Sequence, residues 1–150
     1  MRLITQNAIN ASITIDNKEV AHISSGLLLL VSFTFSDTEE IIDKMINKLL
    51  SLRIFPDENG KTNLSLKDVN AELLSVSQFT LYASVKDGRR PSFTNCLTYD
   101  KAKELYEYFN KKLFETGIHI ETGVFGGDMK VTFTNDGPFT LILDSEELFK

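Results

Sequence analysis

Asn135-Asp136-Gly137-Pro138-Phe139-Thr140 is the stretch that decides the fold at the C-terminal end of the chain. It separates two alternating segments, Val131-Thr132-Phe133-Thr134 and Phe139-Thr140-Leu141-Ile142-Leu143. Asn-Asp-Gly between alternating apolar residues is typical of a β-hairpin, because tight hairpin turns need residues at positive φ. Pro138 is unusual there, since it removes a ladder donor where the return strand should begin to pair, and an X-Pro bond can be cis. We therefore expect a terminal hairpin whose return strand starts late or whose tip has a special role.

A second irregularity lies in the strand expected over residues 70–85. Leu74 and Val76 occupy even positions, whereas the apolar residues Phe79, Leu81, Ala83 and Val85 occupy odd positions. Because side chains alternate between the two faces of a strand, this phase switch means that the strand kinks, bulges or ends its pairing near Ser77-Gln78. The break is either an ordinary bend where the sheet coils or a functional site, since bulges are common beside active sites.

The polar residues around this break limit the chemistry. A serine or threonine nucleophile needs a general base, and no aspartate forms a recognisable triad spacing with Ser77 or Thr80 and a histidine. Backbone N–H groups could instead stabilise a developing oxyanion, an effect of roughly 3–4 kcal/mol per donor. Such a site suits a reaction that needs only carbonyl polarisation, and an activated ester is a good candidate substrate.

The remaining patterns predict an α+β domain. Ser36 and Glu39 form a capping box in front of a helix with apolar residues on one face, and a second helix is expected from about residue 98 to Thr116, followed by Gly117 as its C′ residue. Residues 57–60 read as a turn, with irregular chain to Asp68. Strands are expected over residues 1–15, 19–24, 27–35, 70–85 and 118–125 and in the terminal hairpin, which ends near Leu143. This order, β-β-β-α-β-α-β-β-β, indicates a mainly antiparallel, barrel-like sheet with two helices.

Composition excludes several classes of function. A chain of 150 residues that is 42% hydrophobic is expected to form one compact domain. The single cysteine, Cys96, excludes an internal disulfide. Because the chain has only two histidines, His22 and His119, and neither is near Cys96 in sequence, we expect no metal site and no cofactor. The longest apolar run, Leu27–Val31, is too short to cross a membrane, so a cytoplasmic protein is expected. A formal net charge of -5 disfavours a general nucleic-acid binder, although a local basic patch could contact RNA.

Taken together, Ser77-Gln78-Phe79-Thr80-Leu81 and Asn135–Thr140 resemble the paired signature motifs of the D-aminoacyl-tRNA deacylases. Further blocks that resemble the same family are Leu52-Arg53-Ile54-Phe55, Lys61-Thr62-Asn63-Leu64-Ser65, Gly88-Arg89-Arg90-Pro91-Ser92-Phe93 and Glu121-Thr122-Gly123-Val124-Phe125-Gly126. The resemblance runs from residue 1 to about Ser145 without large gaps. It implies a deacylase-like fold in one domain over residues 1–150, with residues 146–150 as a C-terminal tail.

The resemblance also implies a function in translation quality control. Members of this family are homodimers that hydrolyse the ester between a D-amino acid and the 3′-terminal adenosine of tRNA. Gly137 and Pro138 would form a cis peptide at the dimer interface, reach into the partner's pocket and meet the α-amino group through their carbonyls. This chirality motif would reject an L side chain. It would not exclude achiral glycine, which leaves glycyl-tRNA as a second substrate.

Further site residues follow from the same resemblance. The ester site would be lined by Ser77, Gln78, Phe79 and Thr80. Backbone amides would form the oxyanion hole there, and the substrate's ribose 2′-hydroxyl would assist catalysis, with Thr80 as nucleophile the alternative. Phe125 and Met129 match positions that hold the terminal adenine, although core packing would give the same pattern. The candidates for tRNA phosphate contacts are Lys86, Arg89 and Arg90. As charged residues in a loop, they could equally be solvated without a partner.

Two residues depart from the family pattern, and two other functions stay open. Asn7 follows Gln6 where the family usually has an arginine that would contact the Gly-Pro segment, and Gly127 stands where alanine is common. One alternative is a non-catalytic dimeric module that binds a nucleotide or a tRNA end. The other is a hydrolase of small esters or amides that uses Thr80. Neither a membrane nor DNA is expected as a partner.

Overall fold

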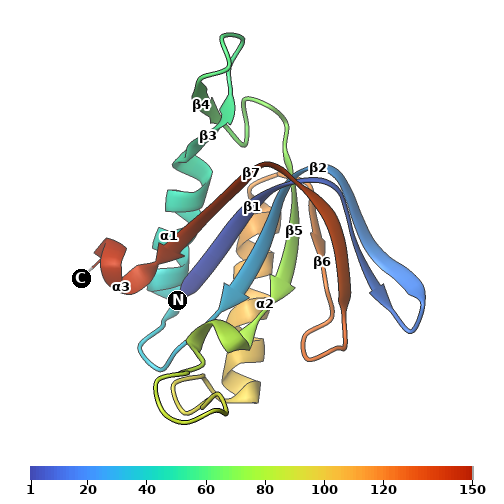
Figure 1. The fold of residues 1–150 in the computed structure, drawn as a ribbon. Helices are drawn as coiled ribbons and strands as arrows, with labels where there is room; N and C mark the ends of the chain where they lie inside the picture. Colours follow the sequence, from blue (N-terminus) through green and yellow to red (C-terminus); the bar gives the residue numbers. More distant parts are fainter. Residues whose placement is uncertain (150) are drawn as a thin grey trace.

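The computed structural model describes residues 1–149, which form a five-stranded sheet, a separate two-stranded hairpin and three α-helices (Figure 1). The elements are β1 (Arg2–Ile15), β2 (Lys18–Ser32), α1 (Glu39–Ser51), β3 (Arg53–Pro56), β4 (Thr62–Ser65), β5 (Glu72–Ser77), the 3₁₀-helix η1 (Phe79–Tyr82), α2 (Tyr99–Glu115), β6 (Ile120–Thr122), β7 (Lys130–Asp144) and α3 (Ser145–Phe149). Within this described part, no helix is long and apolar enough to cross a membrane.

The five strands lie in the order β6-β5-β2-β1-β7. β1 pairs antiparallel with β2 and β7, whereas β5 pairs parallel with β2 and β6. The sheet is therefore mixed, with its longest pairings antiparallel, and β1, β2 and β7 bend strongly along their length (Figure 1). The α+β class with two main helices is confirmed.

The expected terminal hairpin is wrong. β7 is one continuous strand, and both of its halves pair with β1. Gly137-Pro138 lies where the register shifts between Gln6 and Ala8, so the segment is a bulge and not a turn. Val131 and Phe133 pack against the smaller of two apolar clusters, whereas Phe139, Leu141 and Leu143 pack in or against the larger one. The bulge thus marks the place where β7 passes from one cluster to the other.

The break predicted at Ser77-Gln78 is confirmed, but the chain beyond it is not a strand. β5 ends at Ser77, and η1 follows at once. A continuous strand to Val85 is therefore wrong. The Gln78 amide donates to the carbonyl of Val31 on β2 at 2.8 Å. After this backbone hydrogen bond the chain turns away from the sheet into η1.

Two further boundaries differ from the sequence expectation. Residues 19–24 and 27–35 were expected as separate strands, yet β2 runs through Gly26 without a break. Glycine is required at that position because a Cβ atom would lie 1.8 Å from the Glu72 carbonyl oxygen of the adjacent strand. The chain between Asp57 and Asp68, expected to be irregular after the turn, contains β4, which pairs with β3.

The helices form as their periodicity predicts, with one correction at a cap. Thr38, and not Ser36, is the N-cap of α1, and its hydroxyl accepts a hydrogen bond from the Ile41 amide at 3.4 Å. Ser36 instead bonds to Glu146 at 3.4 Å. The buried residues of the two helices are Ile42, Met45, Ile46 and Leu49 on α1 and Ala102, Tyr106, Phe109 and Leu113 on α2. Both faces join the larger cluster, which fills the space between the helices and the sheet.

The C-terminal segment is a helix tied to the start of the chain. α3 begins at Ser145, whose hydroxyl accepts a hydrogen bond from the Met1 ammonium at 2.6 Å and whose amide donates to the Met1 carbonyl at 2.9 Å. The same ammonium pairs with Asp37 in the loop before α1. Residues 146–149 are exposed but belong to this helix, while the expectation of a tail at residue 150 lies outside the described residues.

Candidate active site

A cavity of about 660 Å³ opens where the parallel strands β5 and β6 end, next to the first turn of α2. Its lining comes from the β5–η1 junction, from residues 93–102 and from residues 125–131. The lining residues are Val76, Ser77, Gln78, Phe79, Phe93, Cys96, Leu97, Tyr99, Ala102, Phe125, Gly126, Gly127, Asp128, Met129 and Val131. The fold thus brings together Ser77, Gln78 and Phe79 with Phe125 and Met129, five of the residues singled out in the sequence.

The β5–η1 junction presents backbone and weakly polar side chains to this cavity. Phe79 and Thr80 begin η1, and the first amides of a helix have no partner within it. Ser77 and Gln78 are half-buried, whereas Thr80 is exposed and does not line the cavity. The Gln78 side-chain amide donates to the Thr80 hydroxyl at 2.6 Å. Within residues 1–149 that is the only side-chain hydrogen bond of Thr80, so no base is joined to its hydroxyl.

Aromatic rings form the opposite part of the cavity wall. Phe125 makes an edge contact with Tyr99, with ring centroids 5.1 Å apart, and lies 5.6 Å from the Tyr106 ring. Gly126 has φ 74°, and a Cβ there would come within 2.8 Å of the Tyr99 ring, so glycine lets Tyr99 lie against the backbone. Met129 is half-buried on the same side. The cavity therefore combines flat apolar surfaces with polar backbone, as suits an aromatic base joined to an ester.

Sequence reasoning missed several lining residues. Phe93 pairs with Phe79 at a ring-centroid distance of 5.2 Å, and both rings are about half exposed at the cavity rim. The only sequence signal for Phe93 was that it lies in a block that resembles the deacylases. Tyr99, at the start of a helix, had no sequence signal for a site. Cys96 also lines the cavity, and its thiol donates to the Phe79 carbonyl at 3.3 Å. Burial raises the pKa of this thiol, which disfavours the reactive thiolate.

Gly137 and Pro138 lie apart from this cavity in their own chain. Both are exposed, neither lines the cavity, and the peptide between them is cis, as the resemblance implies. The bulge is closed by Asn135, which accepts a hydrogen bond from the Phe139 amide at 3.1 Å and donates one to the Thr140 hydroxyl at 3.2 Å. The site residues therefore fall into two separate groups within one chain.

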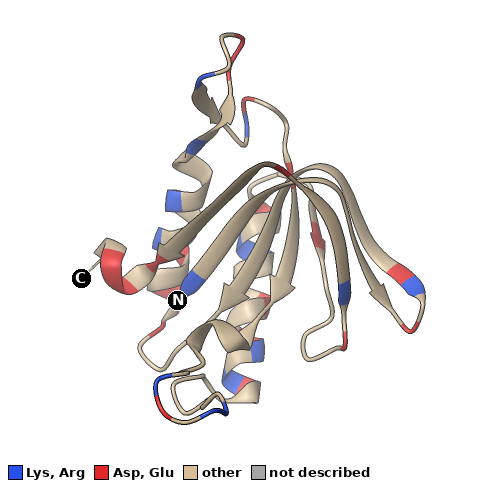
Figure 2. Ribbon diagram, in the orientation of Figure 1, with Lys and Arg blue, Asp and Glu red and all other residues tan. Residues whose placement is uncertain are grey.

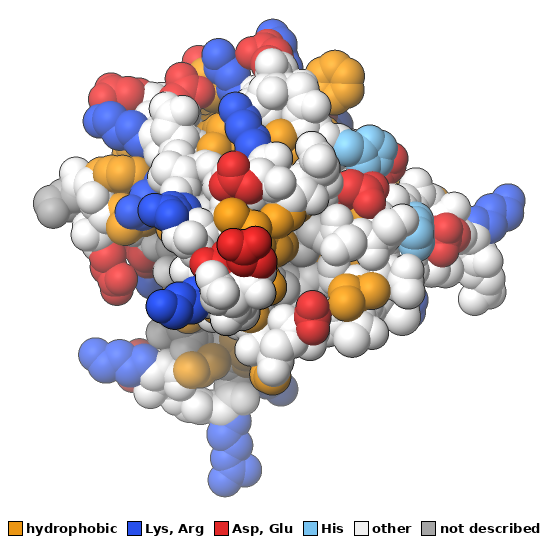
Figure 3. Space-filling view, turned by 90° about the horizontal axis from the view of Figure 1, so that it is seen from above, with side chains coloured by type: hydrophobic (Ala, Val, Ile, Leu, Met, Phe, Trp, Pro, Cys, Tyr) orange, Lys and Arg blue, Asp and Glu red, His pale blue; other side chains and the backbone are white. Residues whose placement is uncertain are grey.

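Two other sequence-derived candidates also lie away from the cavity. Asn7 is buried on β1 where the register shifts opposite the bulge, and its side-chain carbonyl has no hydrogen-bond partner within residues 1–149. The basic residues Lys86, Arg89 and Arg90 are exposed in a loop closed by pairing of Ser84 with Ser92. Figure 2 shows this loop as a basic projection below η1, whereas the face in Figure 3 mixes acidic and basic side chains. Among the described residues, no group of histidine, cysteine, aspartate and glutamate could hold a metal ion.

An α+β fold with a mostly apolar cavity at the ends of parallel strands is typical of a protein that binds a small ligand or the end of a larger one. Residues 4–144 match the family described as D-Tyr-tRNA(Tyr) deacylase. The chain belongs to this family.

Individual relatives agree with this assignment. A D-aminoacyl-tRNA deacylase of Lactobacillus acidophilus is 54% identical over 144 residues, covering 96% of this chain and 99% of the relative. One from Listeria monocytogenes serotype 4b is 49% identical over 150 residues and the full length of both chains. Among solved structures, a c-Myc DNA unwinding element binding protein has a TM-score of 0.90 at 34% identity, covering 96% of this chain and 98% of the other. A probable eukaryotic D-amino acid tRNA deacylase has a TM-score of 0.80 at 20% identity, covering 95% and 97%, and shows the shared fold.

Proposed function

We propose that this chain is a cytoplasmic D-aminoacyl-tRNA deacylase, formed by residues 1–150 as one domain, that hydrolyses the ester to the 3′-terminal adenosine. The observation that carries this proposal is the cavity itself, which combines a signature-motif segment with an aromatic wall and, among residues 1–149, joins no general base to Ser77 or Thr80. Such a site can polarise a carbonyl but offers little to a reaction that must first activate a side-chain nucleophile. An aminoacyl ester is reactive enough that polarising its carbonyl suffices for hydrolysis.

In the proposed complex the ester carbonyl lies against the start of η1. The amides of Phe79 and Thr80 would donate to the developing oxyanion, and the substrate's own 2′-hydroxyl would assist the attack. The terminal adenine would lie between Phe125 and Met129, because aromatic and thioether surfaces suit a base. Lys86, Arg89 and Arg90, in the exposed loop outside the cavity lining, would contact phosphates of the tRNA.

We infer further that the working unit is a homodimer in which Gly137-Pro138 enters the partner's cavity. The exposure of this segment and its separation from its own cavity support the idea. The outer edge of β7 is unpaired within the sheet, and Ile142 on this strand is 70% exposed. An apolar edge strand of this kind is normally covered by a partner. The carbonyls of the segment would meet the α-amino group and leave no room for an L side chain, so glycyl-tRNA is a second substrate.

The test is hydrolysis of matched D-tyrosyl-tRNA and L-tyrosyl-tRNA, with glycyl-tRNA as a third substrate. We expect release of D-tyrosine and glycine while the L ester survives. Equal cleavage of the D and L esters, or cleavage of neither, would contradict the proposal. Binding of uncharged tRNA without any hydrolysis would favour the non-catalytic module. One structural relative is called a DNA unwinding element binding protein, but we do not propose DNA as a ligand of this chain, because the proposed reaction needs an aminoacyl ester, which DNA lacks.

The dimer is tested separately with a matched pair of surface variants. Ile142→Glu places a charge on the β7 edge, whereas Phe114→Glu places one on α2 at a side chain that is 72% exposed. We expect sedimentation to show a monomer for Ile142→Glu and a dimer for Phe114→Glu, with activity lost only in the former. If both variants sediment as the wild type does, β7 is not the interface.

A further inference from the structure

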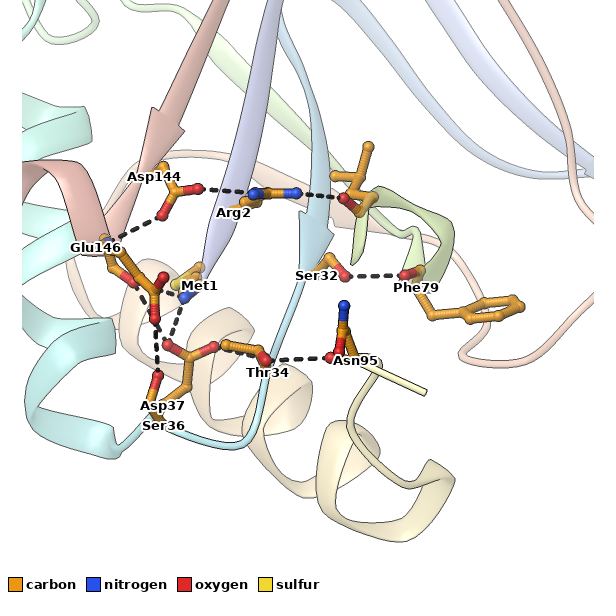
Figure 4. Close-up of polar contacts among 12 residues, drawn as sticks. Met1, Arg2, Ser32, Thr34, Ser36, Asp37, Phe79, Asn95, Asp144 and Glu146 are labelled. Carbon is orange, nitrogen blue, oxygen red and sulfur yellow. Dashed lines mark hydrogen bonds and ion pairs between the residues drawn. The ribbon is translucent and has the colours of Figure 1, made fainter. Parts of the chain in front are cut away.

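The helix η1 is held in place mainly from outside. Gln78 at its N-cap makes no side-chain capping bond. The Phe79 carbonyl accepts hydrogen bonds from the Ser32 hydroxyl and the Cys96 thiol, both at 3.3 Å. The Leu81 carbonyl accepts one from Nη1 of Arg2 at 2.8 Å. Figure 4 shows two of these donors, Arg2 and Ser32, reaching η1 from different strands.

Arg2 makes the strongest of these contacts. A guanidinium donor at 2.8 Å forms a charge-assisted hydrogen bond, whereas a hydroxyl at 3.3 Å is long and a thiol is a weak donor. The same guanidinium lies over the Tyr82 ring, 4.6 Å from its centroid, in a cation–π contact. Arg2 therefore holds the last two residues of η1 at once.

Asp144 at the end of β7 fixes Arg2. Its Oδ2 accepts a hydrogen bond from Arg2 Nε at 2.7 Å, and its Oδ1 accepts one from the Glu146 amide at 2.9 Å. Burial opposes ionisation of Asp144, but the bonds from Arg2 and the Glu146 amide outweigh it and bring its pKa below the ordinary value. The carboxylate side chain is 9% exposed, so Arg2 is tied to an oriented, ionised partner.

We propose that Arg2, oriented by Asp144, is a positioning residue for the ester site: it sets the orientation of η1 and with it the amides of Phe79 and Thr80. This inference rests on the proposed function. Because Asp144 ends the strand that carries Gly137-Pro138, the same guanidinium joins the two signature motifs within one chain. Lysine cannot replace it, since an ammonium lacks the rigid fork that reaches Asp144 and Leu81 together.

The test is Arg2→Lys, which keeps the charge and removes the fork. We expect kcat for D-tyrosyl-tRNA to fall by about 10- to 100-fold, because the oxyanion donors move, while KM stays within about twofold. Asp144→Asn should lower kcat in the same direction by less. The matched control is Arg53→Lys on the β3–β4 hairpin, where Nε donates to the Asn63 carbonyl at 2.7 Å outside the cavity lining. It should keep wild-type kcat.

Amide hydrogen exchange distinguishes positioning from general stability. The Leu81 and Ala83 amides bond to the carbonyls of Gln78 and Thr80 at 3.3 and 3.0 Å, so they report directly on η1. Faster exchange at these two amides alone, with the melting temperature kept, supports the proposal. Faster exchange throughout the sheet would mean that Arg2 only stabilises the fold. Unchanged exchange together with unchanged kcat would mean that Arg2 neither positions η1 nor stabilises the fold. Either result overturns the proposal.

A fall in kcat with unchanged exchange also overturns the proposal, because Arg2 would then act by another route. If the wild type cleaves no aminoacyl-tRNA, the proposed function fails. The exchange comparison between Arg2→Lys and Arg53→Lys still decides in that case whether Arg2 positions η1.

Discussion

The two signature segments interrupt their strands in different ways. At Ser77-Gln78 the strand β5 ends, and the chain enters a 3₁₀-helix that donors from β1, β2 and the 93–97 loop hold in place. At Gly137-Pro138 the strand β7 bulges and then resumes its pairing with β1. The first segment faces a cavity of its own chain, whereas the second is exposed and lines no cavity there.

This difference separates a site that is complete in one chain from a site that needs another. A segment anchored by several elements can orient its amides with no help from a partner. The exposed bulge is closed by Asn135 and by the Gln6 side-chain amide on β1, which donates to the Thr140 hydroxyl at 3.2 Å, whereas Gly137 and Pro138 themselves face solvent. This difference agrees with the proposal that the first segment performs catalysis and the second selects the substrate of a partner, and each role can be tested by substitution.

The largest effect is expected for Gly137→Ala. Gly137 has φ 131°, a region that L side chains rarely adopt, and an added Cβ would lie 3.0 Å from the Phe139 amide nitrogen. The bulge must therefore shift, and we expect the ratio of D- to L-tyrosyl-tRNA hydrolysis to fall on the order of 100-fold. Kinetics on both substrates measure this. Asp136→Ala, at the exposed neighbour, should keep the wild-type ratio.

Mixing variants shows whether Gly137 acts in its own chain or in the partner. Met129→Trp fills the cavity, so this variant and Gly137→Ala should each be defective alone. In a heterodimer of the two, the intact cavity of the Gly137→Ala chain receives the intact bulge of the other. Recovery of D-specific hydrolysis is the expected result, and no recovery would place the bulge at its own cavity.

A smaller effect is expected for Phe125→Leu, which removes the flat ring from the cavity and keeps an apolar side chain. Loss of base stacking costs about 1–3 kcal/mol. We therefore expect KM for D-tyrosyl-tRNA to rise about tenfold, with kcat nearly unchanged. Tyr106→Phe keeps the neighbouring ring and is the control. If Phe125 has only a packing role, the melting temperature falls and KM does not change.

Sequence reasoning predicted some of these features and missed others for physical reasons. The apolar faces of α1 and α2 repeat every three to four residues, and the break at Ser77-Gln78 shows in the phase of its apolar residues, so both are local signals. The bulge at Gly137-Pro138 is not local. Turn residues between two alternating segments describe a hairpin and a bulge equally well, and pairing with β1, more than a hundred residues away, decides between them.

Part of the cavity wall was missed for a similar reason. Phe93 and Tyr99 come from a loop and a helix start that reach the end of β5 only through tertiary packing. Nothing in the spacing of these aromatic residues distinguishes them from ordinary core residues. A capping error has a more local origin, because Ser36 and Thr38 both precede the helix and both are good N-cap residues.

The charge that orients η1 gives a pH-dependent prediction. The folded-state pKa of Asp144 lies below its ordinary value of 3.8, so the unfolded chain binds more protons between the two values. The stabilisation is therefore complete above pH 3.8 and is lost as pH falls through the folded-state pKa. We expect Asp144→Asn to lower the free energy of unfolding at pH 7 by about 1 kcal/mol, a small value because Arg2 is partly exposed. Urea unfolding should show that the difference in free energy of unfolding between the wild type and Asp144→Asn narrows below pH 3.8. A difference that stays constant with pH would exclude the ionised pair as its cause.

The smallest effect is expected for Thr80→Ala, although Thr80 carries the most nucleophilic-looking side chain of the first segment. Its hydroxyl is exposed, accepts a bond from Gln78 at 2.6 Å and is joined to no base within residues 1–149. If the backbone of η1 and the substrate's 2′-hydroxyl perform the reaction, kcat should change by less than about threefold, since only a side-chain contact is lost. Near-total loss would instead identify Thr80 as the nucleophile. A D-tyrosyl ester on a 2′-deoxyadenosine end separates the two mechanisms: it should resist both proteins if the ribose hydroxyl acts, and it should remain a substrate of the wild type if Thr80 does.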